Sequence, residues 1–173
     1  TQLMELLEEG YPLKLCSDVI HHEPKIKKLS ILGITLPMLA QMPPEKRMDF
    51  IQHCYEVQQL LKAGARFEEL EKMPYEFRQQ CLNYSYKIVD FLKTGMTLKQ
   101  WRELPNAVRE QCIHNPYGVK SLLDANVSFE QLSALPLELR TQCIEKADKL
   151  IFLLKSGLSL SQWFELPVES HEQ

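Results

Sequence analysis

One fixed spacing, which recurs from one end of the chain to the other, constrains the fold more than any other feature of this sequence. A residue that tolerates the left-handed backbone conformation recurs at this spacing, and a proline follows each such residue at a constant offset. The positions are Gly33, Gly64, Gly95, Asn126 and Gly157, followed by Pro43, Pro74, Pro105, Pro136 and Pro167. The period is about 31 residues, and fixed periods of about 20 to 50 residues are typical of solenoids and other repeat arrays. The repeat therefore predicts an array of similar structural units.

Each unit carries the signals of helices. Segments such as 98–104 place apolar residues at intervals of three, which predicts a short helix with one buried stripe. The proline that follows cannot continue this helix but suits the first turn of the next one. Four hydroxyl residues precede the short helices and are predicted N-caps, with Arg66 as the exception: Thr35, Thr97, Ser128 and Ser159.

The second helix of each unit is predicted to run for about twenty residues, to the next glycine or asparagine. Pro116 lies inside one of these long helices. Because proline interrupts a helix, two alternatives stay open: a kinked long helix, or a split one that gives three helices per unit.

One unit cannot bury its apolar stripe alone, so neighbouring units must stack. We therefore expect an all-α fold, a superhelical solenoid of right-handed or similar form with partial units at its ends. The four complete units are 33–63, 64–94, 95–125 and 126–156. Residues 1–32 are predicted to be a degenerate N-terminal cap, and 157–173 a partial fifth unit. Since the chain begins without Met and ends inside a unit, we expect it to be a piece of a longer protein.

Composition argues against several functions. The net charge of -3 disfavours binding to a phosphate backbone, and no apolar run approaches the length of about 20 residues that spans a membrane. Five cysteines without a secretory signal indicate a reducing compartment such as the cytoplasm. No phosphate loop, nucleophile elbow or zinc-protease motif is present in the sequence. We expect no catalysis and no cofactor in this region, although the rest of a longer protein could carry an activity.

Cysteine and tryptophan recur at positions typical of a core. Cys81, Cys112 and Cys143 share a repeat position with Phe50, and packed helices lie about 8 to 10 Å apart, too far for a disulfide. We expect these thiols to be buried as small hydrophobic groups. Trp101 and Trp163 share their position with leucines and are predicted core residues.

A metal site is the weakest candidate in the sequence. Cys16, His21 and His22 lie close together in the chain and carry side chains that bind zinc. A structural zinc site needs four ligands at paired spacings, and no second half-site is visible. We therefore expect no metal here.

Arginine recurs three residues before each of the cysteine positions, giving the series Arg47, Arg78, Arg109 and Arg140. Such a ladder could bind phosphate or carboxylate groups, which is the basis of a nucleic-acid-binding alternative. The other interpretation is structural: each guanidinium satisfies carbonyls at a helix junction, or pairs with Glu45, Glu76 or Glu138 two residues earlier. The sequence favours the structural interpretation.

Tyrosine recurs at one position of three successive units, and its neighbours are His or Tyr. The tyrosines are Tyr55, Tyr86 and Tyr117, and the neighbours are His53, Tyr84 and His114. The fourth unit has Asp148 at the tyrosine position, so we expect this position to be at least half exposed. Exposed aromatic residues are typical of protein-binding faces. The alternative is that each tyrosine covers the seam between two units.

Three resemblances are visible at these residues. The segments VSFEQLSALP (127–136) and GLSLSQWFELP (157–167) resemble the helical motif of mitochondrial transcription terminators, which implies a repeat of similar length and nucleic-acid binding. LPLELRTQCI (135–144) resembles the opening of an F-box. The degenerate Leu-Pro helical units are similar to repeats of effectors that intracellular bacteria inject, which implies a location in the host cytosol and a partner there. Taken together, these features predict a non-catalytic scaffold that binds a protein or peptide.

Overall fold

The computed structural model describes residues 6–165, and throughout this range every regular element is an α-helix. The predicted all-α class is therefore confirmed for the described part of the chain. The chain divides into two compact units, unit 1 (Thr1–Tyr86) and unit 2 (Lys87–Gln173).

Helices of six and nine residues follow one another in a fixed order. The six-residue helices are α4 (Leu36–Gln41), α7 (Phe67–Lys72), α10 (Leu98–Glu103), α13 (Phe129–Ala134) and α16 (Leu160–Glu165). The nine-residue helices that come next are α5 (Pro44–Gln52), α8 (Tyr75–Asn83), α11 (Asn106–His114) and α14 (Leu137–Glu145). A second nine-residue helix completes each set: α6 (Cys54–Lys62), α9 (Ser85–Lys93), α12 (Pro116–Asp124) and α15 (Ala147–Lys155). Equivalent helices of successive sets begin one sequence period apart.

The long helix expected from the sequence is split in every one of these sets, so the three-helix alternative is the correct one. The break falls on a single residue, which is His53, Tyr84, Asn115 or Lys146. The ψ angle of these residues lies between 24 and 67°, outside the helical range. Only one break precedes a proline, Pro116, so proline is not the general cause of the split.

The helix pattern also reaches the N-terminal segment, which the sequence indicated to be degenerate. Helices α2 (Leu13–His21) and α3 (Glu23–Ile31) begin one period before α5 and α6. Pro12 caps α2 in the way that Pro43 caps α5, with nearly the same backbone angles. Residues 13–31 thus form the same helix pair as the units that follow, although the glycine spacing hides this relation.

The helix ends confirm most of the sequence signals. The glycines of the periodic series have φ between 84 and 106°, and Asn126 has a φ of 66°, so each lies in the left-handed region. The prolines of the series were predicted to lie in the first turn of a helix, but each one among the described residues is the N-cap, one residue before that turn. Its carbonyl accepts the first helical hydrogen bond, as from Arg78 N to Pro74 O at 3.0 Å. Pro167 lies outside the described residues.

Three of the four predicted hydroxyl caps form. Thr97, Ser128 and Ser159 each accept a hydrogen bond from the backbone N–H three residues later, at 3.2 Å. In all three cases a glutamine at that third position accepts a bond from the backbone N–H of the capping residue. Thr35 was also predicted to cap a helix, but its side chain makes no such bond. Met38 at the third position also cannot form the reciprocal bond of a capping box.

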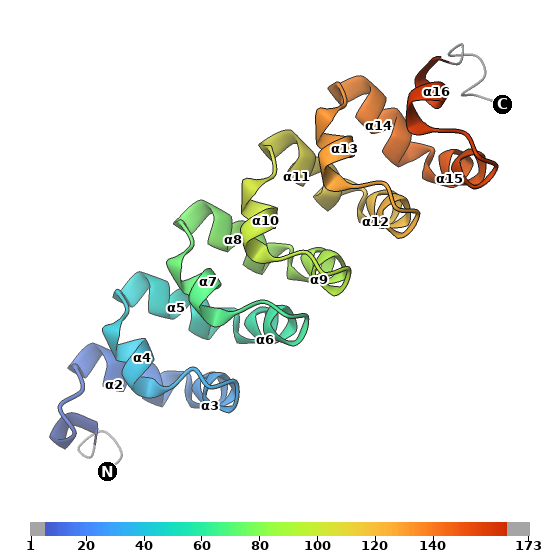
Figure 1. Cartoon of the computed structure of the whole chain (residues 1–173). Coiled ribbons are helices and arrows are strands. Elements are labelled where there is room, and N and C mark those ends of the chain that lie inside the picture. Colours follow the sequence, from blue (N-terminus) through green and yellow to red (C-terminus); the bar gives the residue numbers. More distant parts are fainter. Residues whose placement is uncertain (1–5, 166–173) are drawn as a thin grey trace. The chain divides into compact units, whose positions relative to one another are not determined.

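Within each unit, the second nine-residue helix of one set packs against both nine-residue helices of the next set. In unit 1, α3 packs against α6 and α5, and in unit 2, α12 packs against α15 and α14 (Figure 1). Aromatic contacts fill the cores, with ring centroids 5.0 Å apart for Phe50 and Phe67 and 5.7 Å apart for Phe91 and Trp101. The predicted core residues are buried: Trp101, Trp163, Cys81, Cys112 and Cys143.

Unit 2 contains one unusually close approach between helices. A Cβ atom added to Gly118 of α12 would lie 2.2 Å from the backbone carbonyl oxygen of Ile144 in α14. Only a residue without a side chain fits there, because real Cβ contacts are never this short. At the equivalent position two periods earlier in the sequence, unit 1 has the larger Glu56.

Candidate binding surfaces

The three tyrosines predicted to bind a partner occupy the second residue of α6, α9 and α12. Tyr55 is 57% exposed, Tyr86 62% and Tyr117 70%, as the aspartate at the fourth position led us to expect. Tyrosine is usually more buried than this, because exposing its apolar ring to water costs free energy. Its recurrence at an exposed position therefore marks a surface whose role the core does not explain.

Tyr55 also makes a contact across the seam between two sets of helices. The Nζ atom of Lys28, in α3, lies 3.6 Å from the centroid of the Tyr55 ring, in α6. This is a cation–π geometry, worth about 0.5 to 1 kcal/mol at an exposed site. The ring of Tyr55 is therefore both an exposed aromatic group and part of the contact between α3 and α6.

The His and Tyr neighbours of these tyrosines do not occupy one structural position. His53 and Tyr84 are the break residues that precede α6 and α9, whereas His114 is the last residue of α11. The break residue before α12 is Asn115, whose side chain accepts a hydrogen bond of 3.0 Å from Gly118 N and caps the helix. His53 is half-buried, and its Nδ1 lies 3.0 Å from Asp49 O. His114 is exposed.

In unit 1 the arginine series is buried in ion pairs. Arg47 and Arg78 are 3% and 5% exposed. Arg47 Nη2 lies 2.9 Å from Asp18 Oδ2, and Arg78 Nη2 lies 2.9 Å from Asp49 Oδ2. Arg78 also donates to Met73 O, at the end of α7, at 3.0 Å. The acidic partners are thus Asp18 and Asp49, which come 29 residues earlier, rather than the nearby Glu45 and Glu76.

In unit 2 the acceptors of the arginine series include helix-end carbonyls and neutral side chains. Arg109 donates to the carbonyls of Arg102 and Leu104 at the end of α10, and to Asn106 Oδ1 at 3.1 Å. Arg140 donates to the side-chain oxygen of Gln111 and, at 3.3 Å, to Leu135 O. Both guanidinium groups are buried. A phosphate could reach these arginines only by displacing protein acceptors, which weighs against an anion-binding ladder.

The cysteines and histidines form no metal centre in the described part of the chain. Within residues 6–165, no group of three His, Cys, Asp or Glu side chains is placed to hold a metal ion. His21 Nδ1 lies 2.7 Å from Ser17 O, within its own helix. None of the five cysteines forms a disulfide, and all are buried. Burial raises the pKa of Cys112 and of Cys143 to about 12, so both are protonated thiols with low reactivity near neutral pH.

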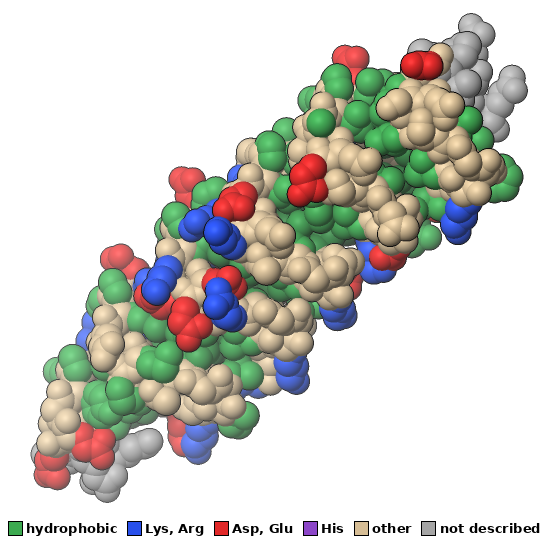
Figure 2. Space-filling view, in the orientation of Figure 1, with side chains coloured by type: hydrophobic (Ala, Val, Ile, Leu, Met, Phe, Trp, Pro, Cys, Tyr) green, Lys and Arg blue, Asp and Glu red, His purple; other side chains and the backbone are tan. Residues whose placement is uncertain are grey.

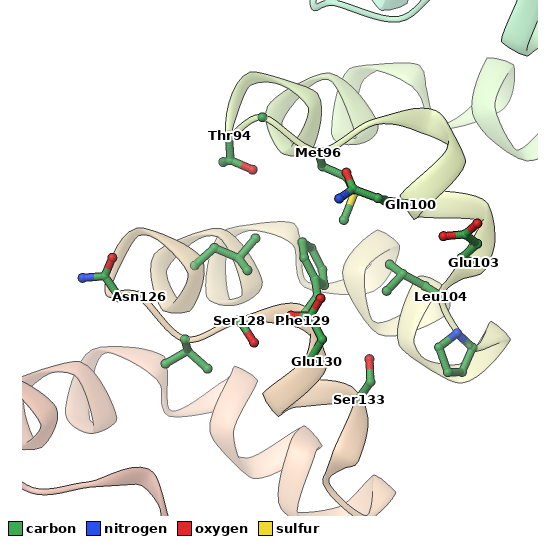
Figure 3. Close-up of a pocket in the computed structure, with 14 residues that line it drawn as sticks. Thr94, Met96, Gln100, Glu103, Leu104, Asn126, Ser128, Phe129, Glu130 and Ser133 are labelled. Carbon is green, nitrogen blue, oxygen red and sulfur yellow. The ribbon is translucent and has the colours of Figure 1, made fainter.

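The structure adds a surface that the sequence did not indicate, a groove between the short helices α10 and α13. Its volume is about 620 Å³, and Gln100, Glu103 and Leu104 face Phe129, Glu130 and Ser133 across it. Figure 3 shows the ring of Phe129 in the space between the two helices, with Met96 and Gln100 on the opposite side. In Figure 2, acidic and hydrophobic side chains adjoin each other over α13.

Unit 1 contains a smaller groove of the same kind between α4 and α7. Its volume is about 260 Å³, and it is lined by Met38, Gln41, Met42, Phe67, Glu68 and Glu71. No motif in the sequence predicts either groove, because each is a space between two helices that lie far apart in the chain. The recurrence of an aromatic and a glutamate at the start of the second short helix is the one sequence signal, as in Phe67–Glu68 and Phe129–Glu130.

Comparisons with protein-family models, with curated proteins and with solved structures found no match to this chain. Across the described residues, no helix has the length and apolar character needed to span a membrane. The function must therefore be argued from the surfaces described above.

Proposed function

We propose that this chain is a non-catalytic helical-repeat scaffold that binds a protein or peptide partner. In this proposal the sets of three helices stack into a superhelical solenoid, and the surface residues of successive sets form a row. The packing of α3 on α6 in unit 1, and of α12 on α15 in unit 2, supports this stacking. Each set buries its apolar stripe against the next, as solenoid repeats do.

The observation that carries the proposal is the exposure of Tyr55, Tyr86 and Tyr117. Tyrosine is enriched in binding hot spots because its rigid ring buries a large area at small entropic cost while its hydroxyl still forms hydrogen bonds. The five buried cysteines without disulfides suit a reducing compartment, such as the cytosol of a host cell if the protein is a bacterial effector.

The nucleic-acid alternative has less support. Its candidate ligands, Arg47, Arg78, Arg109 and Arg140, are all buried and bonded to protein groups. The net charge of -3 also repels a phosphate backbone. We therefore retain the protein-binding proposal alone.

The test is an affinity capture from cytosolic lysate with the native chain and with the Y55A/Y86A/Y117A variant, with and without nuclease. We expect a protein that the native chain still captures after nuclease treatment and that the variant no longer captures. The matched control is Y75A/L137A/F152A, which removes three other exposed apolar side chains (62, 56 and 70% exposed). Equal loss of the partner by both variants would count against a specific tyrosine surface.

Circular dichroism of the same proteins distinguishes binding from folding. The tyrosine variant should keep the helical signal and melting temperature of the native chain. A large loss of helicity would instead assign the tyrosines to the seam between helix sets, as the Lys28–Tyr55 contact does for one of them.

A further inference from the structure

The two grooves between short helices are built from equivalent residues. Each residue that lines the α4–α7 groove has a counterpart, two sequence periods later, that lines the α10–α13 groove. The pairs are Met38 and Gln100, Gln41 and Glu103, Met42 and Leu104, Phe67 and Phe129, Glu68 and Glu130, Glu71 and Ser133. The same kind of surface therefore occurs in both units.

Each groove has an apolar floor. Met42 and Phe67 provide it in unit 1, and Leu104 and Phe129 provide it in unit 2. The ring of Phe129 is held from below by Phe91, with the ring centroids 6.2 Å apart in an edge-to-face arrangement. Leu104 and Phe129 are half-buried, so part of each side chain stays open to a ligand. A volume of about 620 Å³ lies within the range of ligand sites, about 300 to 1,000 Å³.

Each groove also has an acidic rim. Of the described residues that line each groove, two are glutamates and none is a lysine or arginine. In unit 2 these are Glu103 and Glu130, both exposed. The pKa of Glu130 is lowered by hydrogen bonds from its own backbone N–H and from the Ser128 side chain, so this carboxylate is ionised at neutral pH. Glu103 forms a long ion pair with Lys99, with 3.9 Å between Lys99 Nζ and Glu103 Oε1.

The unit 1 groove differs in how much of its charge is already neutralised. Glu71 forms an ion pair with Lys46, whereas Ser133 occupies the equivalent position in unit 2. The unit 2 groove is also the larger of the two. The α10–α13 groove is therefore the better site for a cationic ligand.

We propose that the α10–α13 groove binds a linear peptide segment that places an apolar side chain between Leu104 and Phe129 and a Lys or Arg against Glu103 and Glu130. The apolar floor supplies burial, and the two carboxylates select basic over acidic neighbours by charge complementarity. The α4–α7 groove is a weaker second site of the same type. This binding site is separate from the tyrosine surface and does not depend on it.

The probe is a pool of short fluorescein-labelled peptides in which one Leu or Phe is flanked by Lys or Arg, and the readout is fluorescence anisotropy with the full chain. The test variant is E103K/E130K, and the matched control is E110K/E145K, which reverses two exposed glutamates outside the groove. Both variants change the net charge equally. All four side chains are exposed, so neither variant removes part of the core.

We expect E103K/E130K to weaken binding of the pool by about tenfold or more, because two attractive charge pairs become repulsive. E110K/E145K should bind nearly as the native chain does. A pool with Ser in place of Leu or Phe, and one with Glu in place of Lys or Arg, should both lose binding to the native chain.

Two results would overturn the proposal: no anisotropy change with the native chain, or equal weakening in the two charge variants, which would indicate attraction to the net charge alone. The Y55A/Y86A/Y117A variant should bind the pool as the native chain does. The E103K/E130K variant therefore tests the groove proposal, and the Y55A/Y86A/Y117A variant tests the tyrosine surface, so the two proposals can fail separately.

Discussion

Unit 1 and unit 2 bury the same arginine position against different acceptors. In unit 1, Arg78 of α8 binds the carboxylate of Asp49 in α5. In unit 2, Arg140 of α14 binds the neutral side-chain oxygen of Gln111 in α11. Asp49 and Gln111 lie two sequence periods apart and occupy equivalent positions. In both units the bond joins the first nine-residue helices of two neighbouring sets.

This difference shows that the arginine needs a hydrogen-bond acceptor on the neighbouring helix, and that the acceptor need not be charged. A guanidinium has five donors in a fixed fork and is charged at any ordinary pH, so it can satisfy helix-end carbonyls and one side-chain acceptor together. Either a carboxylate or an amide serves as that acceptor. The arginine therefore bridges helices in both units, through an ion pair at Arg78 and through a neutral acceptor at Arg140.

The largest expected effect comes from removing the carboxylate. The D49A variant should lower the free energy of unfolding by about 3 to 5 kcal/mol, because it leaves the Arg78 charge buried without its partner. Q111A should cost less, about 1.5 to 3 kcal/mol, the value of a hydrogen bond to a charged group. Urea unfolding followed by circular dichroism measures both, with exposed E45A as the control. Equal losses for D49A and Q111A would show that the charge of the acceptor does not matter.

The second expected effect is a pH dependence from the buried thiols of unit 2. The pKa of Cys112 and of Cys143 is about 12 in the folded chain, against about 8.5 for an unfolded thiol. Between these values the unfolded chain loses protons that the folded chain keeps, so stability falls as pH rises. Below pH 8 the two thiols contribute almost no pH dependence.

The slope is at most about 1.4 kcal/mol per pH unit for each thiol. Urea unfolding at pH 8, 9 and 10 in the presence of a reducing agent measures it. The C112A/C143A variant should have a flatter profile than the native chain, since lysines and tyrosines titrate equally in both. Parallel profiles would contradict the assignment to these thiols.

The third effect concerns the close approach at Gly118. The G118A variant should lose about 1 to 3 kcal/mol, because the new methyl group must displace the Ile144 carbonyl or its helix. In a domain of this size the melting temperature should fall by about 2 to 4 °C per kcal/mol. E56A at the equivalent position of unit 1 should change little. An unchanged melting temperature in G118A would mean that α12 and α14 can separate freely.

The smallest effect compares two short-helix caps. T97A in unit 2 removes a capping box and should cost about 1 kcal/mol. T35A in unit 1 should cost close to nothing, because the Thr35 side chain makes no capping bond. Thermal unfolding of the two variants side by side measures the difference. A similar cost for both would mean that Thr35 acts through another contact.

The local conformations could be predicted from the sequence. Gly64 and Asn126 adopt the left-handed conformation that their position at the end of a helix indicated, because this choice depends on one residue and its neighbours. The burial of Trp101 could be predicted because other units have leucine at the same repeat position. The exposure of the tyrosines followed in the same way from Asp148.

Features that depend on how helices pack could not be predicted. Asp18 and Asp49 reach their arginines only because first helices of neighbouring sets lie together, and no local pattern distinguishes them from the nearer Glu45 and Glu76. The break at His53 has no proline or glycine to mark it. Each groove is a space between two helices, so its lining residues come from segments that are far apart in the sequence.

The five buried thiols give the molecule a set of built-in reporters. They lie along the chain at Cys16, Cys54, Cys81, Cys112 and Cys143, with each side chain shielded from solvent. A shielded thiol reacts with an alkylating reagent only when its segment opens, so the labelling rate at each cysteine measures the free energy of local opening there. Mass spectrometry of partly labelled protein would therefore rank the opening of successive helix sets, and the protection gained on binding a partner, without any substitution.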